Sequence, residues 1–120
     1  MHGLLDQART MRLYTMDAWV SDLAILTDEP KLRAALHAGA RAGGATVLGE
    51  KFCVFPSGAV TGVLVLAQSH LSLHTWPELA LANVDLLSYG EVRGSEVIAE
   101  IRSRLDVERA AVSCVPRAVA

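Results

Sequence analysis

Apolar side chains recur along this chain with two different periods, which predicts a fold built from both strands and helices. Residues Arg12–Val20 are rich in β-branched and aromatic side chains and are expected to form the first strand. A helix follows, because Asp28 can cap it and Pro30 suits its first turn. We expect that helix to end at Gly43–Gly44 and to bury the apolar residues that recur at helical spacing, Leu32, Ala35, Leu36 and Ala40.

The second half of the chain contains most of the predicted strands. A turn at Pro56–Gly58 separates the second strand from the third, and the third is so apolar that we expect burial on both of its faces. Ser95 can cap a second helix, whose buried side is predicted to hold Val97, Ile98, Ile101 and Leu105. The strands expected after the first are Ala45–Phe55, Val60–Ala67, Ser69–Trp76, Leu81–Tyr89 and Ala110–Val115.

This order of elements predicts an α+β fold in which helices pack on one face of a mostly antiparallel sheet, as a two-layer sandwich. Residues 10–118 show no repeat, low-complexity tract or linker, so the chain 1–120 is treated as a single domain. The other face of the sheet then needs a covering layer. Because the chain is small and its third strand very apolar, we expect a second copy to cover that face, giving a homodimer.

Composition and charge narrow the classes of function. A chain of 120 residues with 52% hydrophobic side chains is long enough for one core and too short for a two-domain enzyme. Its 11 basic and 13 acidic residues provide no basic field for nucleic acid. No apolar run approaches the roughly 20 residues that cross a bilayer, and no signal-peptide pattern precedes the first strand. We therefore expect a cytoplasmic protein without a membrane or nucleic-acid partner.

The two cysteines, Cys53 and Cys114, are too few for a disulfide framework. We expect both to be buried as reduced thiols, since free cysteine behaves as a small apolar residue. No pair of Cys or His residues has the close spacing of a zinc site, so no metal is expected.

The predicted strand Ser69–Trp76 carries a polar stripe. With the period of two that strands have, Leu71 and Leu73 face one way, and the other face holds His70, Ser72, His74 and Trp76. A half-exposed edge strand with a polar outer face would have the same pattern. Side chains that can donate, accept or stack, next to a buried apolar strand, favour a functional surface without naming its reaction.

Several motifs between Gly58 and Gly90 closely resemble those of the prokaryotic S-adenosylmethionine decarboxylases. The matching segments are Thr61–Ala67, the Ser69–His70 pair, the His-Thr-Trp-Pro-Glu run His74–Glu78 and the Val84–Asp85 pair. A weaker likeness extends upstream through Ala42–Leu48, so the resemblance covers most of the chain. A His-Thr-Trp-Pro-Glu run that begins five residues after the serine is far more specific than a lone glycine motif.

The resemblance implies a self-cleaving proenzyme. In this family the serine at the position of Ser69 attacks the carbonyl of the preceding residue, here Gln68, and the ester that forms breaks down to dehydroalanine and then to a pyruvoyl group. The chain would be cleaved between residues 68 and 69 and would make its own covalent cofactor. The ketone of that group forms a Schiff base with the substrate amine and serves as the electron sink for loss of CO₂.

Three residues match family positions that act in this chemistry. Ser69 is implied as the pyruvoyl precursor, and His74 as the histidine that promotes processing, a task suited to a group that titrates near neutral pH. Thr61 stands where the family has a serine that assists processing, and it keeps the hydroxyl. Parity places Ser69 and His74 on opposite faces of a straight strand, so a histidine that acts on Ser69 requires a turn or bulge at Gln68–Ser69. Without the resemblance, Ser69 would be interpreted as an ordinary strand serine, His74 as a surface histidine and Thr61 as a β-branched strand residue.

Three further residues match substrate-binding positions of the family. Phe55 and Trp76 fall where two rings hold the adenine of the substrate, and flat apolar faces suit a purine and a nearby sulfonium cation. Glu78 matches an acid that accepts hydrogen bonds from the ribose hydroxyls. As bare sequence features, the two aromatic residues would be assigned to the core and Glu78 to the solvated surface.

Two residues depart from the family pattern. Gln68 replaces a glutamate that is common before the serine, a nearly isosteric change that we expect to be tolerated. Tyr89, twenty residues after Ser69, replaces the cysteine assigned to protonating the decarboxylated product carbon. A phenol with a pKa near 10, rather than about 8.5, is about 2 kcal/mol harder to ionise, and its ring would intrude on the pocket. Cys53 lies on the predicted face of Phe55 and could substitute, although burial is the favoured interpretation.

These observations leave three hypotheses, in order of preference. The first is decarboxylation of S-adenosylmethionine in polyamine (spermidine) biosynthesis, supported by Phe55, Trp76 and Glu78. The second keeps the pyruvoyl chemistry but takes a smaller amino acid, ornithine or arginine, because Tyr89 narrows the pocket. The third is an uncleaved, non-catalytic relative, which the missing cysteine suggests.

Overall fold

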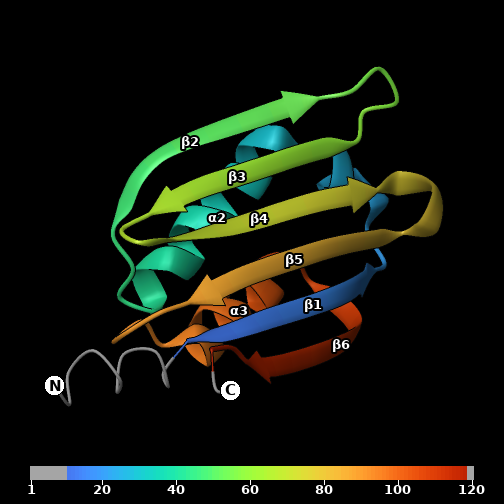
Figure 1. The fold of residues 1–120 in the computed structure, drawn as a ribbon. Helices are drawn as coiled ribbons and strands as arrows, with labels where there is room; N and C mark the ends of the chain where they lie inside the picture. Colours follow the sequence, from blue (N-terminus) through green and yellow to red (C-terminus); the bar gives the residue numbers. More distant parts are fainter. Residues whose placement is uncertain (1–10, 119–120) are drawn as a thin grey trace, which may run out of the picture.

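A computed structural model describes residues 11–118 of the chain. Within that range six antiparallel strands form one sheet in the order β2-β3-β4-β5-β1-β6, and the helices α2 and α3 cover one of its faces (Figure 1). The predicted α+β sandwich is therefore confirmed. In chain order the elements are β1 (Arg12–Val20), η1 (Leu23–Thr27), α2 (Glu29–Ala42), β2 (Val47–Val54), β3 (Val60–Leu66), β4 (Ser69–Trp76), η2 (Pro77–Leu79), β5 (Leu81–Ser88), α3 (Gly94–Arg104) and β6 (Val107–Pro116).

The hydrophobic core lies between the sheet and the two helices. The helices approach each other closely because glycines line part of their contact. A Cβ atom built on Gly39 would lie 2.6 Å from Cγ1 of Ile101, and one on Gly43 would lie 2.2 Å from Cγ2 of Val97. Real Cβ atoms do not make contacts that short, so the two helices can pack this closely only because both positions lack a side chain. The largest fully buried side chains include Met16, Leu36, Leu64, Leu71 and Ile101.

Helix α2 begins and ends where its local signals predict. The Asp28 carboxylate accepts a hydrogen bond from the backbone amide of Lys31 at 3.1 Å, which satisfies one of the free donors of the first turn. Gly43 occupies the C-cap, and Gly44 continues with φ of +75°, a conformation that glycine adopts without strain.

The predicted cap at Ser95 is wrong, because helix α3 already begins at Gly94. Arg93 occupies the N-cap position, and its backbone amide donates to the carbonyl of Gly43 at 2.9 Å. Gly94 lies against the ring of Tyr14, where a Cβ atom would be 2.1 Å from Cε1. Contacts with distant segments, and not a hydroxyl cap, therefore mark this helix start.

The face of the sheet away from the helices, called here the open face, is not covered by a second layer formed by residues 11–118 (Figure 1). Strand β3 was expected to be buried on both faces, but its burial alternates, and Val65 on the open face is 50% exposed. Directly opposed residues of neighbouring strands share a face, so Val65 continues into a row across the sheet with His70, Leu87, Leu13 and Val115. This row leaves a largely apolar band uncovered.

Both cysteines are exposed, so the prediction of buried thiols is wrong. Cys53 lies on β2 and Cys114 on β6, the two outermost strands of the sheet. Strand β6 is exposed along most of its length. Within residues 11–118 no helix has both the length and the apolar character needed to span a bilayer.

Candidate functional site

A pocket of about 240 Å³ lies at the end of the sheet where β4 finishes. Four of the residues that line it were predicted as site residues: Phe55, His74, Trp76 and Glu78. Ser57 and Ala59, from the turn between β2 and β3, complete the lining and were not predicted. The Pro56–Gly58 motif predicted the turn itself but not that Ser57 and Ala59 would line a pocket.

His74 is the centre of this group of side chains. Its Nδ1 atom lies 2.7 Å from Oγ1 of Thr61, a hydrogen bond whose direction depends on the tautomer. The two residues meet because they are directly opposed in the antiparallel ladder of β3 and β4. The ring of Trp76 makes an edge contact with His74 at 4.3 Å between centroids, and the ring of Phe55 lies at 6.0 Å. An imidazole is thus held between two aromatic rings and a hydroxyl.

The neighbouring residue, Thr75, anchors this end of β4 to the protein interior. It is completely buried, and its hydroxyl donates to the carbonyl of Leu26 at 2.7 Å. The same oxygen accepts from the backbone amide of Val60 at 2.9 Å. One side chain therefore ties β4 to β3 and to the turn η1, which fixes the strand on which His74 and Trp76 stand.

A chain of hydrogen bonds runs from Trp76 away from the pocket. The indole Nε1–H donates to Oδ1 of Asn83 at 2.6 Å, and Nδ2 of Asn83 donates to Oδ1 of Asp17 at 2.8 Å. His74, Asn83 and Asp17 are directly opposed on β4, β5 and β1, so they form one row on the open face. Sequence reasoning missed both partners, because Asp17 and Asn83 are 66 positions apart.

Ser69 lies at the opposite end of β4. The strands β3 and β4 are joined through Ala67 and Gln68, and Gln68 has φ of +64°, a left-handed conformation that is strained for a residue with a side chain. The required turn at this junction is present. It precedes Ser69, however, so Ser69 and His74 stand on opposite faces of one strand. Their separation of five residues is about 17 Å at the usual rise per residue.

The hydroxyl of Ser69 is buried and has no hydrogen-bond partner among the described residues. Tyr89 follows the end of β5, two residues after Leu87, which is opposed to His70. It therefore belongs to the same end of the sheet as Ser69. The predicted site residues form two groups within one chain, one with Gln68, Ser69 and Tyr89, and the other with Phe55, Thr61, His74, Trp76 and Glu78.

Cys53 extends the row of His74 toward the edge of the sheet. It is directly opposed to Thr61, which is itself opposed to His74, so its exposed thiol shares the open face with both. Its predicted placement on the face of Phe55 agrees with this row. Among residues 11–118 no group of three or more His, Cys, Asp or Glu side chains gathers closely enough to hold a metal ion.

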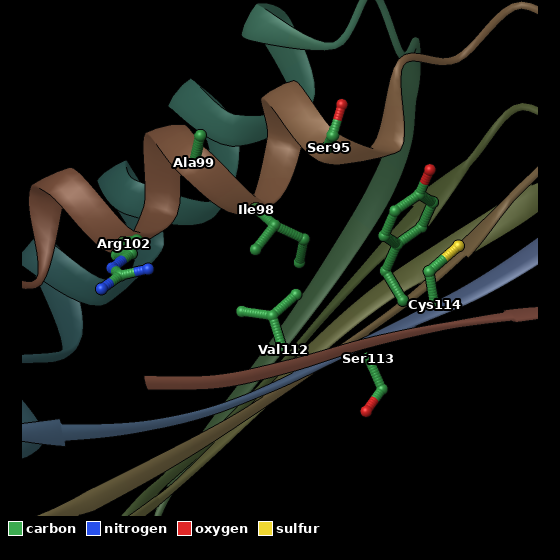
Figure 2. A pocket seen from close by; sticks show the side chains of 8 residues that line it. Ser95, Ile98, Ala99, Arg102, Val112, Ser113 and Cys114 are labelled. Carbon is green, nitrogen blue, oxygen red and sulfur yellow. The ribbon is translucent and has the colours of Figure 1, made fainter. Parts of the chain in front are cut away.

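A larger cavity, of about 310 Å³, lies on the helix side of the sheet between α3 and β6. Figure 2 shows Ile98 of α3 facing Val112 of β6 across it, with Cys114 at one end and Arg102 at the other. Burial raises the pKa of Tyr14, which lines this cavity, and a hydrogen bond with Cys114 raises it further. None of the predicted site residues lines this cavity.

Comparison with known proteins gives a consistent result. A family model described as S-adenosylmethionine decarboxylase matches residues 12–118. The S-adenosylmethionine decarboxylase proenzyme of Methanococcus maripaludis is 36% identical over 105 residues, which cover 87% of this chain and 86% of that protein. The proenzyme of Methanococcus vannielii is 37% identical over the same shares of both chains. The crystal structure of the adenosylmethionine decarboxylase of Aquifex aeolicus superposes with a TM-score of 0.83 over 92% of both chains, at 24% identity.

Proposed function

The chain belongs to the S-adenosylmethionine decarboxylase family, and on that premise we propose that it is a proenzyme that cleaves itself before Ser69 and then decarboxylates S-adenosylmethionine. The proposal rests on the environment of the Ser69 hydroxyl and on the backbone conformation just before it. A buried hydroxyl without a partner is unfavourable and rare, and it stands directly after a residue held at positive φ. A nucleophile with no hydrogen-bond partner within residues 11–118 is thus adjacent to the strained peptide unit that it would attack.

The cleavage requires only atoms of the chain and water. Oγ of Ser69 adds to the carbonyl carbon of Gln68, the peptide C–N bond breaks, and an ester replaces the amide. Loss of the Cα proton of Ser69 then expels the Gln68 carboxylate and leaves dehydroalanine. Hydrolysis of that product releases ammonia and gives a ketone. These residues therefore fit a pyruvoyl group at the new N-terminus of the second fragment, and such a group supplies the electron sink for decarboxylation.

The pocket at the other end of β4 suits the proposed substrate. Phe55 and Trp76 are 44% and 40% exposed, so their flat faces are available to a purine and to the adjacent sulfonium cation. Glu78 lines the same pocket and can accept hydrogen bonds from ribose hydroxyls. His74, hydrogen-bonded to Thr61 between the two rings, can donate or accept a proton there.

The two groups of residues lie too far apart to act together within one chain, and a homodimer resolves this separation. The open face carries exposed apolar side chains, including Val65 at 50% and Val115 at 47% exposure. If two such faces pack around a two-fold axis that lies across the strands, each end of the sheet comes to lie over the opposite end of the other copy. The end of one sheet that carries Ser69 would then lie over the end of the second sheet that carries His74 and the substrate pocket.

The presence of Tyr89 favours a second candidate function, decarboxylation of a smaller amino acid. It lies at the same end of the sheet as Ser69, and a ring in the place of the family's thiol would reduce the space near the proposed reactive group. A smaller amino acid such as ornithine or arginine would tolerate that loss of space. The third candidate is an uncleaved, non-catalytic relative, and it is separated from the other two by whether the purified chain is cleaved.

The proposal is tested by the mass of the purified protein under denaturing conditions, followed by release of CO₂ from carboxyl-labelled substrates. We expect two fragments, 1–68 and 69–120, the second blocked to N-terminal sequencing, and CO₂ from S-adenosylmethionine. CO₂ from ornithine or arginine alone would establish the second candidate and refute the first. A single intact chain after long incubation would refute the proenzyme.

A further inference from the structure

We propose that Asp17 and Asn83 are positioning residues that hold the ring of Trp76 against His74 and so shape the substrate pocket. The inference rests on the proposed function, because it assigns Trp76 the role of a pocket wall. It concerns two residues that line no part of the pocket themselves. Asp17 stands two strands away from Trp76, on β1.

The donor and acceptor groups of Trp76, Asn83 and Asp17 fix the direction of both hydrogen bonds between them. An indole N–H can only donate, and an ionised carboxylate can only accept. The amide of Asn83 must therefore present its oxygen to Trp76, at 2.6 Å, and its nitrogen to Asp17, at 2.8 Å. Without Asp17 the amide loses the acceptor that orients it, and a flipped amide would direct its NH₂ group at the indole N–H.

Packing within one chain does not by itself fix the orientation of the Trp76 ring. Trp76 is 40% exposed, and it stands on the open face, where no second layer from the described part of the chain covers it. The hydrogen bond to Asn83 therefore has a large share in selecting the ring orientation that gives the 4.3 Å edge contact with His74. A ring that rotates away would widen the pocket on that side and remove one of the two aromatic neighbours of the imidazole.

The two hydrogen bonds that link Trp76 to Asn83 and Asn83 to Asp17 are called here the relay. Loss of the relay should affect substrate binding more than the chemical steps. The substitutions leave the hydrogen bond between His74 and Thr61 and the residues around Ser69 in place, so the self-cleavage rate should change less than KM. The substrate meets the displaced ring, so KM should rise. Asp85 provides a matched control, because it is an exposed carboxylate on the same face of β5, opposed to Thr15 and Ser72, and it has no part in the hydrogen-bond chain.

The experiment uses the full chain with Trp19→Phe, so that Trp76 is the single fluorophore of the two tryptophans. In that background we compare Asp17→Ala, Asn83→Ala, Asp17→Asn and Asp85→Asn. We expect the acrylamide quenching constant of Trp76 to rise at least 1.5-fold in the two alanine variants. KM for S-adenosylmethionine should rise about 5- to 20-fold, with kcat within threefold. Asp17→Asn retains an acceptor oxygen, so its quenching constant and KM should lie between those of the alanine variants and those of Asp85→Asn. Asp85→Asn should match the parent in both quantities.

Two results would overturn the inference. One is quenching of Trp76 in Asp17→Ala that equals that of Asp85→Asn, since the ring would then be held without the relay. The other is an equal fall of kcat and of the self-cleavage rate with unchanged KM, which would indicate a general structural role. The quenching measurement needs no activity and can be made on the uncleaved Ser69→Ala chain, so its outcome is separate from that of the proposed function.

Discussion

Thr75→Val tests whether the hydroxyl of one buried residue holds the strand that carries the site. Valine has the shape of threonine but neither donates nor accepts a hydrogen bond. The substitution therefore leaves two groups in the interior without their partner, the carbonyl of Leu26 and the backbone amide of Val60, which now lie 2.7 Å and 2.9 Å from Oγ1. Thr75 is 0% exposed, so water cannot replace the lost contacts without a rearrangement.

The expected loss follows from these two contacts. A buried polar group left unsatisfied costs about 1–3 kcal/mol. Burial of the added methyl group offsets about 0.8 kcal/mol of the sum. For two such groups, we therefore expect Thr75→Val to lower the free energy of unfolding by about 1–5 kcal/mol.

Urea unfolding followed by far-UV circular dichroism measures this loss, at one protein concentration and in the Ser69→Ala background, so that neither association nor cleavage differs between samples. Thr27→Val is the matched control, because Thr27 is exposed and its hydroxyl makes only a 3.4 Å contact with the carbonyl of Ala24. The control should change the unfolding free energy by less than about 0.5 kcal/mol. A loss below about 1 kcal/mol in Thr75→Val would refute the argument that this hydroxyl anchors β4.

Three further changes have defined outcomes. Ser69→Ala should give a folded chain that stays intact by denaturing mass spectrometry; two fragments from this variant would disprove cleavage at residue 69. Tyr89→Cys should raise turnover of S-adenosylmethionine by removing the bulky ring and restoring a thiol, and unchanged or lower turnover would count against that role of Tyr89. The pKa of Tyr14 is raised by burial and by Cys114, so in a Tyr89→Phe background, which leaves Tyr14 as the single tyrosine, its phenolate absorbance should appear above pH 10 and vanish when Tyr14→Phe is added. The stability that this neutral phenol contributes is present below pH 10 and is lost as pH rises through the folded-state pKa; titration of Tyr14 at or below pH 10 would contradict this.

Local signals predicted those elements whose boundaries depend on nearby residues. Strand β1 spans Arg12–Val20 as its β-branched composition predicts, and helix α2 starts after Asp28, whose carboxylate caps it. The start of α3 depends instead on the contact of Gly94 with Tyr14, which is distant in sequence. Likewise, the exposure of both thiols follows from the order of strands in the sheet, which apolar character alone cannot indicate.

The candidate site shows the same division. Period-two alternation places His74 and Trp76 on one face, and parity separates Ser69 from His74, as the structure has them. The pairing of Thr61 with His74 and the relay from Trp76 to Asp17 require the register of neighbouring strands. Sequence periodicity assigns a side chain to a face but does not say which strand lies beside it.

The central claim is that Ser69 of one chain and His74 of another form one active centre. Co-expression of Ser69→Ala and His74→Ala chains, with tags that distinguish their masses, tests this claim most directly. Each variant expressed by itself should remain uncleaved, whereas the mixture should contain fragments 1–68 and 69–120 from the His74→Ala chain only. Absence of fragments from the mixture, under conditions in which the unmodified chain cleaves and mixed dimers are present, would contradict a shared centre.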